Sequence, residues 1–399
     1  MRPLSVCLVC GEYPPGPHGG IGTMVQQLAR GLAGLGYRVR VVGIYGAGFP
    51  GAARDMDGDV ELWRLREPTH SAGWLVARYQ LYRTIARWSR AREIDLVEVP
   101  DWAGAAAGWP RLPVPVVARL NGSATYFAAE MGTTVDPRLE RFERVSLHRA
   151  DFWCSASRYT AERTRRIFGL RSEPAAILYN ATELPEREGG ATLARRARKV
   201  VFTGTLARKK GVVSLVRAWP LVHAACPDAE LHLLGKDDRL EGGASMMDHL
   251  RSLLPAEVRP SVHFHGHVPR EELFAALRTA RVAAFPSYAE AFAFAPLEAM
   301  ACGCATVYSR RGSGPELIED GRDGLLVDPD SPAEIAGAIQ RLLVDDELAL
   351  RIATAGRERV ESAFSVQGFV AQSDALFRRC VSEFGSRSRA AEAPRVAVT

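Results

Sequence analysis

The chain has 399 residues, of which 47% are hydrophobic, and carries 51 Lys and Arg residues against 46 Asp and Glu residues. This length allows two domains, each with its own core. No run approaches the roughly eighteen consecutive apolar residues that a membrane span requires. Residues 1–15 predict a first strand rather than a signal peptide, because a turn-rich segment follows where a cleavage site should lie. We therefore expect a cytoplasmic protein.

The seven cysteines do not predict a disulfide framework. Their number is odd and their spacing is not that of a small disulfide-bonded domain, which favours reduced thiols in a large intracellular protein. Cys7 and Cys10 form a C-x-x-C sequence. Within a strand these two side chains would point to opposite faces, so buried packing is favoured over redox chemistry.

The first half of the chain alternates short β-branched runs with longer amphipathic runs. The predicted strands are 5–10, 38–44, 95–99, 114–120, 151–155 and 175–179. The predicted helices between them are 22–35, 72–92, 137–150 and 158–168. This alternation predicts a mostly parallel sheet with helices on both faces and ligand sites at the carboxyl ends of the strands.

The same alternation begins again after a polar segment. The second set of predicted strands is 199–204, 229–235, 262–266, 281–287, 305–309 and 324–328. Helices are expected at 211–224, 244–254, 269–279, 296–302, 332–343 and 346–362. We therefore predict an N-terminal domain over 1–182, a hinge over 183–198 and a C-terminal domain over 199–365. Residues 366–384 predict a helix that crosses back to the first domain, and residues 385–399 a disordered tail.

The charge is concentrated in the first half. Residues 1–198 hold 27 Lys and Arg against 20 Asp and Glu, while residues 199–399 hold 24 against 26. Part of the excess lies in the helical stretch 74–92, where arginines alternate with aromatic and aliphatic residues. This pattern fits a helix on an anionic membrane surface, and it fits equally a packed helix with one solvated face.

The stretch 286–303, PSYAEAFAFAPLEAMACG, concentrates the polar chemistry of the second half. Glu290 and Glu298 flank a run of small and aromatic residues. Pro296 suits the first position of a helix, which would place Glu298 in the first turn and end the helix at Gly303. Because a helix N-terminus presents unpaired N–H groups, this turn predicts a seat for a phosphate.

The spacing E-x7-E in this stretch, followed by GSGPELIEDGRDGLLVDP (312–329), resembles the donor-binding region of retaining glycosyltransferases of family 4. Three further segments carry the resemblance: GEYPPGPHGGIG (11–22), LYNATEL (178–184) and GTLARKKG (204–211). The resemblance implies the GT-B fold, an α/β architecture of two facing, doubly wound, Rossmann-like domains with a deep interdomain cleft. It also implies that the N-terminal domain binds the acceptor and the C-terminal domain the nucleotide sugar.

The resemblance assigns roles to the two glutamates and the loop between them. It implies that Glu290 contacts the donor sugar as a catalytic residue and that Glu298 accepts hydrogen bonds from the ribose hydroxyls. It places the donor-binding backbone at Phe292, Ala293, Phe294 and Ala295.

A basic residue is expected for the leaving group, because cleavage of a sugar–diphosphate bond leaves negative charge on the phosphate. By resemblance this catalytic residue is Lys210. The family commonly has Arg where this chain has Thr205, so Arg208 or Lys209 would have to substitute at that end of the donor. A solvated basic turn is the alternative interpretation.

Three more predictions concern the first domain and the sugar. Gly20 and Gly22 lie in the loop after the first strand, where the backbone of family members approaches the donor phosphate or the acceptor; a plain tight turn is the alternative. Asn121 occupies a place where many members have a catalytic His, and Asn cannot titrate near neutral pH. Ala291 and Ala293 replace glycines of the common motif, which adds two methyl groups beside the sugar.

The resemblance implies transfer with retention of configuration from a nucleoside-diphosphate sugar to a hydroxyl acceptor, such as a small natural product, a glycolipid or a glycan. No cofactor, metal or nucleic acid is expected, since no His, Asp and Glu cluster shows ligand spacing in the sequence. Peripheral membrane contact through the basic first domain is an open alternative. The rival functions are a GT-B sugar synthase, phosphorylase or epimerase, and a sugar-nucleotide-binding protein without transfer.

Overall fold

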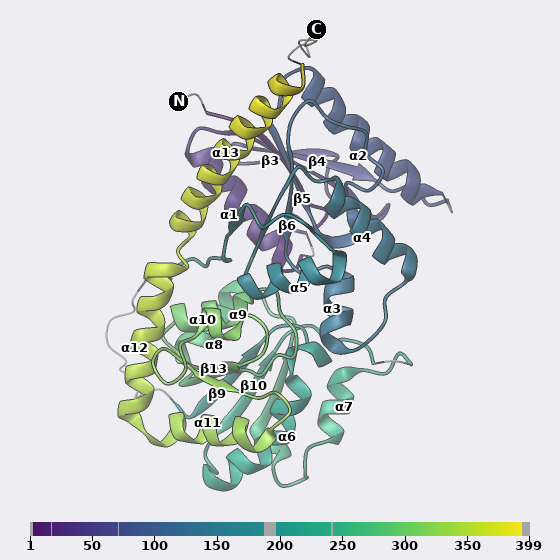
Figure 1. Ribbon diagram of the computed structural model, residues 1–399. Helices are drawn as coiled ribbons and strands as arrows, with labels where there is room; N and C mark the ends of the chain where they lie inside the picture. The colour runs from purple at the N-terminus through teal and green to yellow at the C-terminus, as the bar shows by residue number, and fades with distance from the viewer. Residues whose placement is uncertain (1–2, 17, 71, 187–196, 241, 393–399) are drawn as a thin grey trace. The chain divides into compact units, whose positions relative to one another are not determined.

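The computed structural model describes residues 3–16, 18–70, 72–186, 197–240 and 242–392. The described chain divides into two compact units (Figure 1). The first unit takes its residues from 1–129, 134–179 and the C-terminal segment after 366, and the second from 130–133 and 180–365. Each unit is built on its own mostly parallel sheet, as the two rounds of βα alternation predicted.

The first unit contains an eight-stranded sheet in the order β3-β4-β2-β1-β5-β6-β7-β8. Neighbouring strands are parallel except for the antiparallel pair β3 and β4. The strands are β1 (Ser5–Val9), β2 (Arg38–Tyr45), β3 (Arg54–Asp57), β4 (Val60–Arg66), β5 (Leu96–Pro100), β6 (Val116–Leu120), β7 (Phe152–Ser155) and β8 (Ala176–Ile177). Its helices are α1 (Gly20–Gly34), α2 (Gly73–Arg90), η1 (Trp102–Gly104), α3 (Ala124–Met131), α4 (Pro137–Arg149), α5 (Arg158–Phe168) and α13 (Val366–Glu392).

The central strands of this sheet are buried along their whole length. Strand β6 is buried at every position, and β1 at all positions but its first. Side chains from both strands join Trp88, Phe168 and the other members of one hydrophobic cluster. Continuous burial is typical of parallel strands that are covered on both faces, and it explains why their sequences lack alternation.

Strands β3 and β4 were absent from the sequence prediction. The sequence of β3, Arg-Asp-Met-Asp, is polar and mostly exposed, so no apolar pattern marks it. Its strand conformation is set by pairing with β4 and by contacts such as the Arg54 guanidinium 3.9 Å from the Trp63 ring centroid. Tyr13 also donates a hydrogen bond of 2.7 Å to Asp57 from outside the hairpin.

The second unit contains a six-stranded, wholly parallel sheet in the order β11-β10-β9-β12-β13-β14. The strands are β9 (Lys199–Thr203), β10 (Glu230–Leu234), β11 (Val262–Gly266), β12 (Val282–Phe285), β13 (Ala305–Ser309) and β14 (Leu325–Val327). The helices are η3 (Arg208–Lys210), α6 (Val212–Ala225), α7 (Met246–Ser252), η4 (Arg259–Ser261), α8 (Arg270–Thr279), α9 (Phe294–Ala301), α10 (Gly314–Leu317), α11 (Pro332–Val344) and α12 (Asp346–Ala363).

The chain after Ser365 returns to the first unit as the long helix α13, which packs against α1 (Figure 1). The prediction of a disordered tail from residue 385 is wrong for residues 385–392, which continue this helix. Arg and Ala favour helix there, and Arg387 lies within 3.5 Å of the Glu383 carboxylate and 5.0 Å from the Phe152 ring centroid. Residues 393–399 lie outside the described residues, as does most of the predicted hinge, 187–196.

All seven cysteines are free and buried, as the sequence predicted. Burial raises the pKa of the thiols of Cys7, Cys10, Cys154 and Cys380 to about 12, which leaves them protonated and unreactive at neutral pH. Within the part of the chain that the structure describes, no helix combines the length and the apolar character that crossing a membrane requires.

Candidate functional site

In the second unit, two loops at the carboxyl ends of β9 and β12 interlock at Gly211. This glycine has a φ of +71°, and a Cβ built on it would lie 1.7 Å from the Pro286 carbonyl oxygen. Only glycine permits both the left-handed backbone and the close approach. The interlock brings the basic turn η3 against the loop that follows β12.

Lys210 and Glu290, the two catalytic candidates of this unit, form an ion pair with a distance of 2.6 Å between Nζ and Oε1. The Lys210 and Glu290 side chains are 27% and 12% exposed, so the ion pair fixes both groups while part of each stays accessible to solvent. Ser287 donates a 3.3 Å hydrogen bond to the same carboxylate oxygen. An ammonium group has three donors, so Lys210 can bind Glu290 and a phosphate oxygen at the same time.

The three other polar candidates of this turn are placed differently. The carbonyl oxygen of Lys209 accepts from the amides of Tyr288 and Ala289, at 2.8 and 3.3 Å. Burial lowers the pKa of its ammonium group. Thr205 and Arg208 are exposed. Their donor-binding roles therefore remain predictions.

The loop after Glu290 leads directly into helix α9. Its N-cap is Ala293, which makes no side-chain capping bond, so the first helical amides are not satisfied by a cap. The prediction that Pro296 is the first helical residue is wrong: the helix begins at Phe294, and Pro296 is third. The reason is that none of the first four helical residues needs its N–H for an intrahelical bond, so proline is tolerated there.

Glu298 consequently lies in the second turn of α9 rather than the first. It is 7% exposed, and its Oε1 accepts a 3.0 Å hydrogen bond from Arg270 at the start of α8. Burial raises the pKa of this carboxyl above its ordinary value, while the Arg270 guanidinium opposes the rise. The helix ends at Ala301, and Gly303 closes it as predicted: the amides of Gly303 and Cys304 bond back to Met300 and Ala299.

Phe292 and Ala293 of the predicted donor segment are buried, whereas Phe294 and Ala295 are half-buried. Phe292 is 3% exposed and its ring lies 5.4 Å from that of Phe364. Its carbonyl oxygen accepts a 2.8 Å hydrogen bond from the Asn180 side chain. Ala291 and Ala293 are buried as well. The buried side chains of this segment are thus not available to a ligand, and its donor-binding role remains a prediction.

In the first unit, Asn121 directly follows β6, in a loop whose backbone amides are hydrogen-bonded to a buried carboxylate. Asp101 accepts hydrogen bonds from the amides of Asn121 and Gly122, at 3.0 and 3.1 Å. Burial raises the pKa of Asp101 to about 7, and the neighbouring Glu143 adds to the rise. The Nδ2 atom of Asn121 is buried without a hydrogen-bond partner among the described residues. A donor atom in this state is suited to a ligand oxygen.

Glu143 fixes the next part of the same loop. This fully buried carboxylate accepts from the amides of Ala103, Ala124 and Thr125 and from the Thr125 hydroxyl, at 2.5 to 3.3 Å. The loop geometry around Asn121 thus depends on two carboxylates that bond mainly to backbone.

The glycine loop before α1 is also held by a carboxylate. Gly22 donates its amide to Glu12 at 2.8 Å, and a Cβ on Gly22 would lie 2.1 Å from the Glu12 carbonyl oxygen. Gly22 is buried, whereas Gly20, the first residue of α1, is exposed. Glu12 therefore occupies one amide of this helix start, and contact of the loop with a ligand remains a prediction.

Arg270, Asp101 and Glu143 were not found from the sequence. Asp101 lies two residues after the predicted strand 95–99 and directly follows β5, so its place at a strand end was a usable signal. No sequence signal marked Arg270 or Glu143, because each contacts its partner from a helix that is distant in the sequence.

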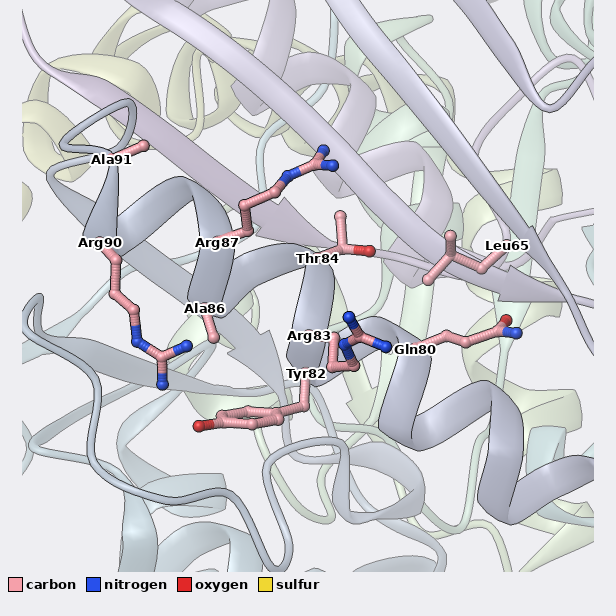
Figure 2. Close-up of a pocket in the computed structure, with 9 residues that line it drawn as sticks. All are labelled: Leu65, Gln80, Tyr82, Arg83, Thr84, Ala86, Arg87, Arg90 and Ala91. Carbon is pink, nitrogen blue, oxygen red and sulfur yellow. The ribbon is translucent and has the colours of Figure 1, made fainter.

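A second concave surface lies on helix α2 (Figure 2), with a volume of about 790 Å³. Arg83, Arg87 and Arg90 of its lining are exposed. The opposite face of α2 packs into the core through Ala77, Leu81, Ile85 and Trp88. The packed-helix interpretation is thus correct for that face.

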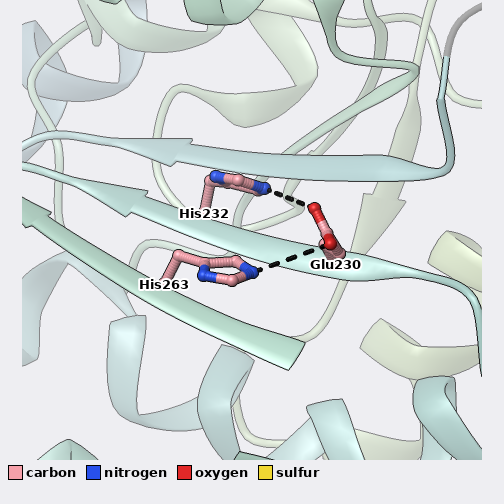
Figure 3. Close-up of side chains that lie close together, drawn as sticks. All are labelled: Glu230, His232 and His263. Atoms are coloured by element: carbon pink, nitrogen blue, oxygen red, sulfur yellow. Dashed lines mark hydrogen bonds and ion pairs between the residues drawn. The ribbon is translucent and has the colours of Figure 1, made fainter. Parts of the chain in front are cut away.

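The sequence spacing gave no sign of a metal-ligand cluster, but the fold brings three residues of suitable type together. The expectation that the protein needs no metal stays a prediction. Glu230, His232 and His263 bring one ligand atom each to within 4.8 Å of one another (Figure 3). Parallel pairing of β10 with β11 joins residues 31 positions apart, which local sequence spacing cannot reveal.

Comparison with known proteins agrees with this geometry. Residues 19–181 match the family described as "Glycosyl transferase 4-like domain", and residues 197–345 match "Glycosyl transferases group 1". A glycogen synthase of Mycobacterium tuberculosis is 24% identical over 386 residues, covering 91% of this chain and 92% of that protein. A D-inositol 3-phosphate glycosyltransferase of Corynebacterium jeikeium is 36% identical over 172 residues, covering 43% and 40%.

Solved structures share the fold. Sucrose-phosphate synthase from Thermosynechococcus elongatus aligns with a TM-score of 0.79 at 22% identity, covering 95% of this chain and all of that chain. The Anabaena protein HepE in complex with UDP and glucose aligns with a TM-score of 0.72 at 18% identity, covering 94% and 100%. The two Rossmann-like units and the paired matches define a glycosyltransferase of the GT-B class. Within that class, the chain belongs to family 4.

Proposed function

We propose that the protein is a retaining glycosyltransferase that moves a sugar from a nucleoside-diphosphate sugar to a hydroxyl acceptor. The observation that carries this proposal is the accessible Lys210–Glu290 ion pair, 2.6 Å long, just before the uncapped start of α9. Cation, carboxylate and free helical amides are the groups that a sugar diphosphate requires. The Anabaena neighbour was solved with UDP and glucose, which favours a uridine nucleotide as the first donor to test.

In this mechanism the diphosphate lies at the amides of Phe294 and Ala295 and is neutralised by Lys210. Glu290 hydrogen-bonds the sugar, and Glu298 accepts from the ribose hydroxyls. The acceptor oxygen attacks the anomeric carbon on the face from which the diphosphate leaves. The bond from that carbon to the diphosphate oxygen breaks, and the acceptor proton passes to the same oxygen. No protein nucleophile and no metal enter the step.

The decisive experiment incubates the purified protein with UDP-glucose, other nucleoside-diphosphate sugars and a panel of hydroxyl acceptors. NMR of the product should show the anomeric configuration of the donor. An inverted linkage would refute the retaining mechanism. If the protein binds the nucleotide sugar but releases no nucleoside diphosphate with any acceptor, the sugar-nucleotide-binding alternative is favoured. A free sugar phosphate as product would favour a phosphorylase, and an epimerised donor would favour an epimerase.

The variant Glu290→Ala separates sugar handling from nucleotide binding. It should lower transfer to background while the dissociation constant for UDP changes less than threefold, because Glu290 is assigned to the sugar alone. Glu347→Ala, at the exposed start of α12, is a control outside the donor-binding segments and should retain transfer. Transfer by Glu290→Ala at the wild-type rate would remove this residue from the catalytic site.

Peripheral contact with an anionic membrane is proposed as a secondary property. Helix α2 exposes Trp74, Leu75 and Tyr79 at 41%, 52% and 60%, and its arginines follow on the same helix. Exposed aromatic residues beside arginines suit a lipid surface. Sedimentation with phosphatidylglycerol vesicles should recover the wild-type protein and lose the Arg83→Ala, Arg87→Ala double variant. Equal recovery of both would refute the contact.

A further inference from the structure

Four polar side chains gather on one face of the second sheet, away from the glycosyltransferase motifs. Strand β11 is the edge strand and pairs in parallel with β10, and His232 lies opposite His263 in the register. Side chains two residues apart on a strand share a face, so Glu230 and His232 of β10 lie beside His263 of β11 (Figure 3). His265 of β11 lies on the same face and stacks on His232.

The ligand atoms of three of these residues converge. His232 Nε2 lies 3.1 Å and His263 Nε2 3.9 Å from the two oxygens of Glu230, and one ligand atom of each residue lies within 4.8 Å of the others. Tetrahedral zinc with bonds of about 2.0 to 2.2 Å holds its ligand atoms roughly 3.3 to 3.5 Å apart. The Glu230 side chain is 54% exposed and can make the small adjustment.

Two features of the imidazoles suit metal ligation. The Nε2 atom of His263 is buried and has no hydrogen-bond partner among the described residues, although it faces Glu230. The other ring nitrogen of His232, Nδ1, lies 2.9 Å from Nε2 of His265, and these two rings are stacked at 13°. A hydrogen bond to the second nitrogen is the usual support that orients a metal-binding histidine.

The donor atoms of the cluster indicate which metal ions it would bind. The site offers two imidazole nitrogens and one carboxylate. Such a set suits zinc, nickel or copper, whereas magnesium and calcium prefer oxygen ligands.

We propose that Glu230, His232 and His263 bind a divalent transition-metal ion, with zinc as the ion to test. Glu230 is the first residue of β10 and His263 the second of β11, whereas the Lys210–Glu290 pair follows the carboxyl ends of β9 and β12. The ion therefore takes no part in sugar transfer. It ties the edge strand β11 to β10, and the proposal stands independently of the glycosyltransferase mechanism.

The test titrates the purified, metal-free, full-length protein with zinc chloride in competition with a chromophoric chelator. The wild type should bind one zinc ion per chain, and millimolar magnesium should not displace it. The variants His263→Gln and Glu230→Gln should each lower the zinc affinity at least tenfold. His249→Gln, on α7 of the same unit, is the matched control and should bind zinc like the wild type.

Thermal unfolding of the same proteins separates a lost site from a lost fold. Without metal, all four proteins should unfold within a few degrees of one another. Zinc should raise the melting temperature of the wild type and of His249→Gln, and should leave that of the two ligand variants unchanged. A wild type that binds no zinc, or ligand variants that bind it as tightly as the wild type, would overturn the proposal.

Discussion

The two units use buried carboxylates in opposite ways. In the second unit, Glu290 and Glu298 each face a cation, Lys210 and Arg270, and both cations remain partly exposed. In the first unit, Asp101 and Glu143 bond mainly to backbone amides of the loop around Asn121. The arrangement in the second unit leaves charged groups partly accessible, whereas that in the first unit fixes the path of the backbone. Substitutions in the two groups should therefore affect different properties.

The largest effect is expected at Lys210. Lys210→Ala removes the cation assigned to the leaving diphosphate and should lower kcat about 100- to 1000-fold, as loss of one charge-stabilising donor does in other enzymes. Lys210→Arg keeps the charge and should recover part of the activity. Steady-state UDP release from the cognate donor measures both. Activity of Lys210→Ala within tenfold of the wild type would exclude this role.

Substitution of Glu143 should lower the stability of the fold rather than act directly on the transfer reaction. Glu143→Ala leaves several buried donors without an acceptor, and we expect the free energy of unfolding to fall by about 3 kcal/mol or more. Glu140→Ala, on the same helix, loses only an exposed pair with Arg144 and should cost less than about 1 kcal/mol. Urea denaturation compares them. Equal losses would contradict the difference between the two kinds of carboxylate.

Asp101 should make the stability depend on pH. Its pKa in the folded protein, about 7, lies above its ordinary value of 3.8, so the folded state holds the proton more tightly. The proton on Asp101 therefore stabilises the folded state fully below about pH 4, and this stabilisation is lost as the pH rises to 7. From pH 5 to pH 8 we expect the free energy of unfolding of the wild type to fall by roughly 1 to 3 kcal/mol relative to that of Asp101→Asn.

Urea unfolding at several pH values, with both proteins measured in parallel, tests this expectation. The difference in unfolding free energy between wild type and Asp101→Asn should change steadily between pH 5 and pH 7 and level off above that range. Parallel curves would mean that Asp101 does not titrate in this window.

The smallest effect is expected at Glu298. Glu298→Gln keeps the shape but removes the carboxylate assigned to the ribose, so the dissociation constant for UDP should rise about tenfold, equivalent to about 1.4 kcal/mol. The kcat at saturating donor should change less than threefold, because the ribose is remote from the reacting carbon. Calorimetric titration with UDP measures the first quantity. An unchanged dissociation constant would leave Glu298 only its structural contact with Arg270.

Except for β3 and β4, the β-branched runs predicted the strands of both sheets, because a buried parallel strand needs a continuous apolar segment. They could not predict β3, whose four polar residues are ordered by pairing with β4. The predicted start of α9 is two residues late for a different reason. Proline is accepted anywhere in the first turn, so its position alone does not identify the first helical residue.

By itself, the sequence determined the repeated βα order and the positions of Lys210, Glu290 and Glu298 in motifs of family 4, because these features depend on residues close together in the chain. Only the tertiary structure decided which charges meet. The Lys210–Glu290 distance, the Arg270–Glu298 pair, the two carboxylates behind Asn121 and the histidines of β10 and β11 all join distant segments. Such contacts follow from strand order and loop packing, which no local spacing encodes.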